Sequence, residues 1–241
     1  MLSICILETD RLRPELEADF QGYGQMFKRL FQRQPVPARF TVFNVVAGEY
    51  PAPGDSFDAY LITGSKADAF GLDPWIVQLR EFLLARYQAG DTMLGICFGH
   101  QLLALLLGGQ CGRAQQGWGL GVHQYRLAAQ LPWMTSAGET FDLLVSHQDQ
   151  VSVLPPGAQL LASSAFCPLA AYCIGDQVLC FQGHPEFVED YAGALMELRR
   201  SQYDSAVYEA AQASLAGGHD GALIAQWMMQ FVGADLSRAT M

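Results

Sequence analysis

Short apolar runs alternate with longer amphipathic segments over the first hundred residues of the chain. Runs of this length, bounded by polar or turn-forming residues, are typical of buried strands. They lie at residues 3–7, 40–46, 59–63 and 93–96. Residues 11–32 and 74–87 place apolar side chains at helical spacing, although Gly22 and Gly24 weaken the middle of the first segment. This alternation predicts an α/β fold with a doubly wound, mostly parallel central sheet and helices on both faces.

The hydrophobic pattern changes after about residue 117. Five short β-rich runs follow, joined by turns such as Gly175-Asp176, and they predict antiparallel or mixed pairing. These runs lie at residues 125–128, 141–146, 159–163, 169–174 and 178–181. Helical segments follow at residues 187–200, 203–216 and 222–231. The whole pattern predicts one domain over residues 1–241, with a small antiparallel sheet beside the central sheet and extra helices from about residue 200.

Composition narrows the classes of partner and compartment. The chain has 241 residues and a net charge of -10, which disfavours nucleic acid and anionic membranes as partners. No apolar run approaches the roughly 20 residues of a membrane-spanning helix, and the first residues lack the basic start of a signal peptide. The six cysteines form no CxxC pair. We therefore expect free thiols, no zinc site and a cytoplasmic protein.

One cysteine stands where a strand is expected to turn sharply into a helix. The apolar run ending at Ile96 leads into Cys97, glycines lie two residues before and after it, and an apolar helical segment follows. This is the layout of a nucleophile elbow, in which the positive end of the helix favours a thiolate. The alternative is a buried structural cysteine, since free cysteines are often buried.

Two polar segments follow predicted strands in the second half of the chain. His184 lies two residues before Glu186, and a histidine oriented by a carboxylate could serve Cys97 as a base. The alternative is a surface His-Pro turn with a solvated glutamate. His147 and Asp149 lie in the other segment, which could equally be an ordinary polar loop.

Taken in order, these segments resemble the class I, or triad, glutamine amidotransferases. Residues 95–101 resemble the nucleophile motif of that family, residues 146–149 its Ser-His-x-Asp segment and residues 182–186 its His-Pro-Glu motif. Residues 61–65, 73–76 and 117–119 resemble, more narrowly, the stand-alone branch that includes the γ-glutamyl peptidases. The resemblance covers roughly residues 1 to 200 and implies a flavodoxin-like fold.

The resemblance also implies a reaction and three catalytic residues. Cys97 would attack the γ-carbonyl of a γ-glutamyl amide and form a γ-glutamyl thioester. His184, oriented by Glu186, would protonate the leaving ammonia or amine and then activate water. The reaction needs no metal and no organic cofactor.

The resemblance further implies how the substrate is held. Backbone N–H groups of Phe98 and of the Gly64-Ser65 turn would bind the oxyanion, although the family often has two glycines at that turn. The remaining implied contacts hold the α-amino and carboxylate groups of the glutamyl substrate. They come from Gln101, His147 and Asp149.

Three functions remain open from the sequence. The first is a glutaminase-type amidotransferase that passes ammonia to a separate synthase subunit, because the sequence has no nucleotide-binding P-loop. The second is a γ-glutamyl peptidase that acts on glutathione-like peptides or conjugates. The third is a non-catalytic binding or regulatory protein on the same fold, which an intact triad argues against. The sequence predicts neither the oligomeric state nor the role of the last helices.

Overall fold

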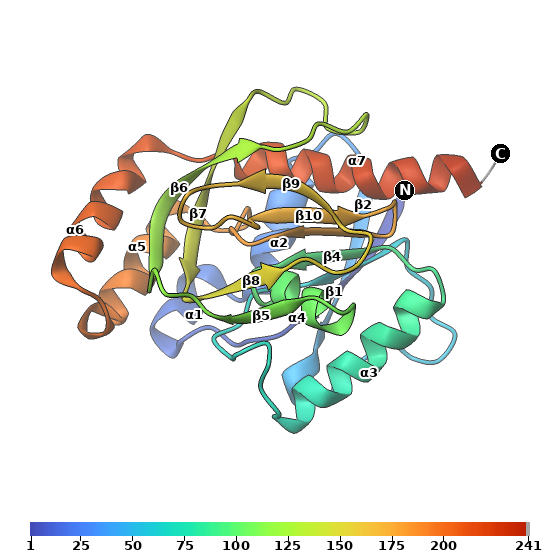
Figure 1. Ribbon diagram of the computed structural model, residues 1–241. Helices are drawn as coiled ribbons and strands as arrows, with labels where there is room; N and C mark the ends of the chain where they lie inside the picture. The colour runs from blue at the N-terminus through green and yellow to red at the C-terminus, as the bar shows by residue number, and fades with distance from the viewer. Residues whose placement is uncertain (240–241) are drawn as a thin grey trace.

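The computed structural model describes residues 1–239, and within them a nine-stranded sheet forms the centre of the molecule (Figure 1). Its strands occur in the order β2-β1-β3-β4-β11-β10-β9-β6-β7. Their bounds are β1 Leu2–Glu8, β2 Ala38–Asn44, β3 Ala59–Ile62, β4 Met93–Ile96, β6 Gly119–Leu127, β7 Thr140–His147, β9 Gln159–Ser163, β10 Ala171–Ile174 and β11 Val178–Phe181. The predicted strands are therefore present, with ends that move by a few residues.

The two halves of this sheet pair differently. Strands β2, β1, β3, β4 and β11 pair in parallel, and β11, β10, β9, β6 and β7 pair antiparallel. The predicted α/β class is confirmed, and the central sheet is mixed. A separate two-stranded antiparallel sheet joins β5 (Gln110–Arg113) to β8 (Asp149–Val153) and packs against helix α4. The late strands of the sequence thus extend the central sheet, and the small sheet comes from two segments that the pattern did not mark.

Helices cover both faces of the sheet. One apolar core joins it to α2 and α7 through residues such as Phe27, Phe31 and Trp227, and a second joins it to α3 and α4 through Leu79 and Leu102. Figure 1 shows α7 and α3 on opposite sides, with α5 and α6 at the end of the sheet near β6 and β7. The helix bounds are α1 Pro14–Phe20, α2 Tyr23–Gln32, α3 Pro74–Gln88, α4 Phe98–Leu106, α5 Glu189–Leu198, α6 Ser205–Ser214 and α7 Gly221–Ala239. Short 3-10 turns lie at η1 Val45–Ala47, η2 Arg200–Gln202 and η3 Leu215–Gly217.

The predicted helix over residues 11–32 is wrong in its middle, where the chain breaks it into α1 and α2. Gln21 and Gly22 have φ values of 70° and 150°, which a helix cannot contain. A side chain at position 22 would also lie 2.8 Å from the Glu8 carboxylate. That carboxylate accepts a hydrogen bond from the N–H of Gly24 at 2.8 Å. This bond holds the start of α2 against the end of β1.

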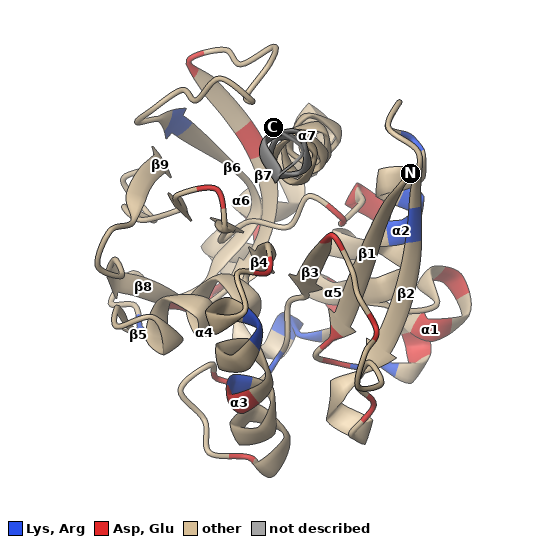
Figure 2. Cartoon of the chain, turned by 90° about the vertical axis from the view of Figure 1, so that its right-hand side faces the viewer, with Lys and Arg blue, Asp and Glu red and all other residues tan. Residues whose placement is uncertain are grey.

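Few charged residues lie in the central sheet. Figure 2 shows acidic residues on α1 and on several loops, whereas most of the central sheet carries neither colour. Among residues 1–239, no helix combines the length and the apolar character that crossing a membrane requires.

Candidate active site

Cys97 lies on a strained turn between β4 and α4. Its φ of 51° and ψ of -97° are unusual for a residue with a side chain, and the turn places it at the N-terminus of the helix. Both flanking glycines are needed at close approaches. A Cβ on Gly95 would lie 2.8 Å from the Cys180 sulfur, and a Cβ on Gly99 would lie 2.5 Å from the Ile62 carbonyl oxygen. The elbow predicted from the sequence is therefore present.

The strand order brings three chain segments to Cys97. Strand β4 pairs in parallel with β3 on one side and with β11 on the other, so all three end at the same edge of the sheet. Gly64 and Ser65 follow β3, Cys97 follows β4, and His184 follows β11. The N–H of His184 donates to the carbonyl of Leu144 in β7 at 2.8 Å, which holds the segment after β11 in place. This edge is where ligands bind in parallel α/β sheets.

Cys97, His184 and Glu186 lie together and are nearly enclosed. His184 Nδ1 and Glu186 Oε1 are 2.8 Å apart, and the two side chains are 4% and 0% exposed. Phe187 stacks on the imidazole with ring centroids 3.9 Å apart. Cys97 and His184 line the same small recess, and the sulfur acts on the charge of the imidazole. Glu186 Oε2 is buried and has no hydrogen-bond partner among the side chains described in residues 1–233, so His184 is the group there that stabilises this carboxylate.

The charge of His184 follows from these contacts. Burial lowers the pKa of the imidazole, but the carboxylate of Glu186 and the Cys97 sulfur outweigh burial and raise the pKa of His184 to about 10. A cationic His184 therefore lies beside the Cys97 sulfur, at the N-terminus of α4. The arrangement can therefore supply a nucleophile and a proton donor from neighbouring groups.

Two backbone N–H groups close to Cys97 in the fold have no acceptor among residues 1–239. A Cβ on Gly64 would lie 3.5 Å from Cys97 Cβ, so the turn after β3 lies directly against the elbow. The carbonyl of Gly64 accepts from Thr9 Oγ1 at 2.9 Å, which anchors this turn. In the described part of the chain, the N–H groups of Ser65 and Phe98 donate no hydrogen bond. These two N–H groups are thus available to an oxygen atom next to Cys97.

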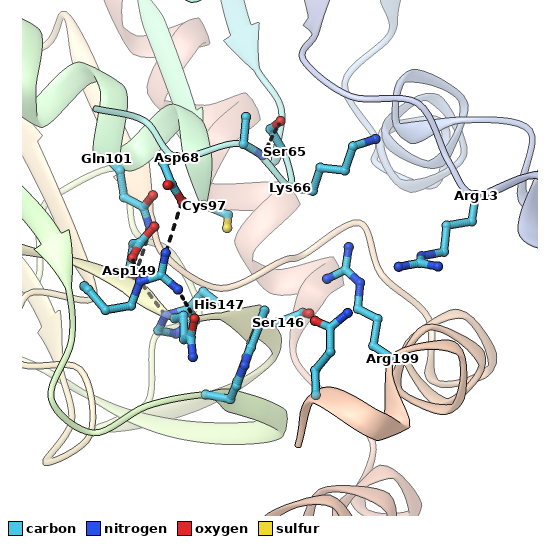
Figure 3. Close-up of a pocket in the computed structure, with 15 residues that line it drawn as sticks. Arg13, Ser65, Lys66, Asp68, Cys97, Gln101, Ser146, His147, Asp149 and Arg199 are labelled. Atoms are coloured by element: carbon cyan, nitrogen blue, oxygen red, sulfur yellow. Dashed lines mark hydrogen bonds and ion pairs between the residues drawn. The ribbon is translucent and has the colours of Figure 1, made fainter. Parts of the chain in front are cut away.

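A cavity of about 290 Å³ opens beside the cysteine. Figure 3 shows the Cys97 sulfur between two groups of side chains that line this cavity. Gln101, His147 and Asp149 lie on one side of the sulfur. On the other side lie Lys66, Arg13 and Arg199.

The three side chains predicted to contact substrate line this cavity, but each also has a partner in the protein. Gln101 Nε2 donates to the carbonyl of Asp149 at 2.8 Å and to Gln182 Oε1 at 3.1 Å. His147 Nδ1 lies 3.1 Å from the same Asp149 carbonyl, and burial lowers the pKa of His147 to about 3. The Asp149 carboxylate pairs with Arg113 at 2.8 Å, and burial raises the pKa of Asp149 to about 6 despite that pairing.

Sequence reasoning missed the cationic side chains of the cavity. Arg113 is the last residue of β5, a strand that the pattern did not mark, and it pairs with Asp149 and with Asp68. Arg13 precedes α1 and Arg199 ends α5, and neither has a motif around it that signals a site. Among residues 1–233, whose side chains are described, no group of three His, Cys, Asp or Glu side chains is arranged to hold a metal ion.

Known proteins resemble this chain in sequence and in fold. Residues 76–198 match the family model described as glutamine amidotransferase class-I. γ-Glutamyl peptidase 3 of Arabidopsis thaliana is 34% identical over 176 residues, which cover 70% of each chain. γ-Glutamyl peptidase 4 of the same plant is 34% identical over 178 residues, covering 71% of this chain and 70% of the relative. A glutamine amidotransferase of Thermotoga maritima has the same fold, with a TM-score of 0.75 at 17% identity over 96% of this chain and 98% of the other.

Proposed function

The chain belongs to the class I glutamine amidotransferase family, and we propose that it is a cysteine hydrolase that cleaves γ-glutamyl amide bonds. The observation that carries the proposal is the enclosed contact of Cys97, His184 and Glu186 beside a cavity that reaches the sulfur. A thiolate, an acid–base and an orienting carboxylate are the parts that acyl transfer to a cysteine requires.

The first half of the reaction forms a thioester. The Cys97 thiolate attacks the γ-carbonyl carbon, and the carbonyl oxygen becomes an oxyanion that the N–H groups of Phe98 and Ser65 bind. When the oxyanion collapses, the C–N bond breaks and the leaving amine takes the proton of His184. Glu186 holds Nδ1 of the imidazole during this transfer, so that the other ring nitrogen serves the reacting atoms.

The second half releases glutamate. Water attacks the thioester carbonyl as His184, now neutral, takes one of its protons. The C–S bond breaks, glutamate departs, and Cys97 and His184 return to their starting charges. We propose that Gln101, His147 and Asp149 hold the α-amino and α-carboxylate groups of the glutamyl half, because they line the cavity beside the sulfur. No cofactor takes part.

A second candidate is a peptidase specific for γ-glutamyl peptides. Relatives named γ-glutamyl peptidases match this chain at 31% to 34% identity. The cavity also continues past Cys97 on the side away from Gln101. Glutamine would fill this part of the cavity with its amide nitrogen alone, whereas a γ-glutamyl peptide would fill it with a whole residue. If the protein is instead a glutaminase-type amidotransferase, ammonia would pass to a separate synthase subunit. We place either activity in a single cytoplasmic domain.

The experiment compares ammonia release from glutamine with glutamate release from γ-glutamyl dipeptides and glutathione. Cys97→Ala should abolish both activities, because no other group in the site can form the thioester. Cys111→Ala is the matched control, since Cys111 is only partly buried and lies outside the triad. Activity that persists in Cys97→Ala would overturn the mechanism. Rapid turnover of glutamine alone would favour the amidotransferase, and preference for peptides would favour the peptidase.

A further inference from the structure

The cavity beside Cys97 carries excess positive charge, although the chain has a net charge of -10. Its lining includes two carboxylates, and both pair with Arg113: Asp149 at 2.8 Å and Asp68 at 3.3 Å. These ion pairs lie on the Gln101 side of the sulfur (Figure 3). Three more cations, Arg13, Lys66 and Arg199, lie on the other side of the sulfur.

Two of these three cations lack a carboxylate partner. Lys66 Nζ pairs with Asp10 at 2.8 Å. Arg13 and Arg199 form no ion pair with any side chain of residues 1–233, and Figure 3 shows their guanidinium groups turned toward one another. Like charges that approach at a partly enclosed site repel, so an anion placed between them would be bound favourably.

Arg199 also lies close to the reacting groups. A small recess of about 20 Å³ is lined by Arg199 together with Cys97, His184 and Ser65. In the proposed function, on which this step rests, His184 hands its proton to the leaving amine. Arg199 is therefore on the side of the site where the amine half of the substrate lies, opposite the side chains proposed to hold the glutamyl half.

We propose that Arg199 and Arg13, supported by Lys66, bind a free carboxylate on the amine half of the substrate. The preferred substrates are then γ-glutamyl peptides whose released half is an amino acid or a short peptide with a free C-terminus. Guanidinium groups suit this task because they bind carboxylates through paired N–H donors. Glutamine has no such carboxylate, so it uses only the glutamyl half of the site.

The test uses γ-glutamylglycine and γ-glutamylglycinamide, which differ in the carboxylate. In the full-length enzyme, we expect kcat/KM to be about 10- to 100-fold higher for the acid. Arg199→Met keeps an apolar stem but removes the charge, and it should erase most of this preference while changing turnover of glutamine and of the glycinamide by less than about threefold. Arg200→Met is the matched control, because the Arg200 guanidinium lies over the Tyr208 ring at 4.1 Å and does not line the cavity.

Comparing the acid-to-amide ratio between wild type and variant cancels the intrinsic difference between the two leaving amines. An unchanged ratio in Arg199→Met, or an equal loss on acid, amide and glutamine, would overturn the inference. The equal loss would place Arg199 on the glutamyl carboxylate instead.

A binding measurement separates this inference from the proposed function. Calorimetric titration of the Cys97→Ser enzyme should show tighter binding of γ-glutamylglycine than of its amide, by about tenfold or more, and Arg199→Met should remove the difference. Equal affinities, or no binding of either compound, would refute the carboxylate site even if γ-glutamyl amides are hydrolysed. Absence of Cys97-dependent turnover of every γ-glutamyl amide, with the acid still bound selectively, would refute the proposed reaction alone.

Discussion

Gly64→Ala tests whether the turn after β3 and the imidazole of His184 occupy the positions that the site requires. The added Cβ would lie 2.6 Å from His184 Cε1, whereas ordinary contact begins at about 3.4 Å. The two groups must therefore separate by about 0.8 Å, which is the difference between those distances. Gly64 does not have a positive φ, so the expected effect comes from this contact and not from backbone strain.

Neither group can move without loss. The imidazole is stacked on Phe187 and hydrogen-bonded to Glu186, so its displacement disturbs the group that we propose donates the proton. The turn is anchored through Thr9, and its displacement moves the N–H of Ser65. Because a misplacement of about 1 Å can cost about 100-fold in rate, we expect kcat/KM to fall by about that factor, or about 2.7 kcal/mol in the barrier.

The assay is steady-state hydrolysis of a γ-glutamyl amide, with thermal unfolding measured on the same preparations. Gly217→Ala is the matched control, because nothing lies within 4 Å of a Cβ added there. The control should keep its activity, and Gly64→Ala should remain folded at the assay temperature. A folded Gly64→Ala enzyme with unchanged kcat/KM would refute the close packing of this turn against His184 as a requirement of the reaction.

Three further outcomes follow from the site. Glu186→Gln removes the carboxylate that raises the pKa of His184, and kcat should fall by about 10²- to 10⁴-fold, measured across a pH series; a loss below tenfold would contradict the orienting role. The pKa of His147 falls from 6.5 to about 3 on burial, so its contribution to stability is present above pH 6.5 and is lost as pH falls toward 3. Between pH 7 and pH 5, the free energy of unfolding should therefore fall by up to about 2 kcal/mol because of this group. In His147→Gln the free energy of unfolding should fall by less over the same range. Equal falls in wild type and variant would contradict the assignment of this loss to His147. Brief iodoacetamide treatment near neutral pH should label Cys97 before the other five cysteines by mass mapping, and uniform labelling would exclude an activated thiolate.

Local patterns predicted the parts of the fold that depend on nearby residues. Helix α3 begins at Pro74 as expected, and β9 and β11 have the predicted bounds. The break between α1 and α2 escaped prediction, because Gly22 only weakens a helix in isolation. The contact of Gly22 with the end of β1, distant in sequence, converts that weakness into a break.

The sequence by itself determined the elbow at Cys97, since a tight strand-to-helix turn with small neighbours depends on a few adjacent residues. It also supplied His184 and Glu186 as a pair two residues apart. Only the tertiary structure decided that β3, β4 and β11 are adjacent, and so that Ser65, Cys97 and His184 meet at one edge. The same holds for the cationic side of the cavity. Arg13 and Arg199 come from opposite ends of the chain, and only the packing of distant helices at the end of the sheet brings their charges together.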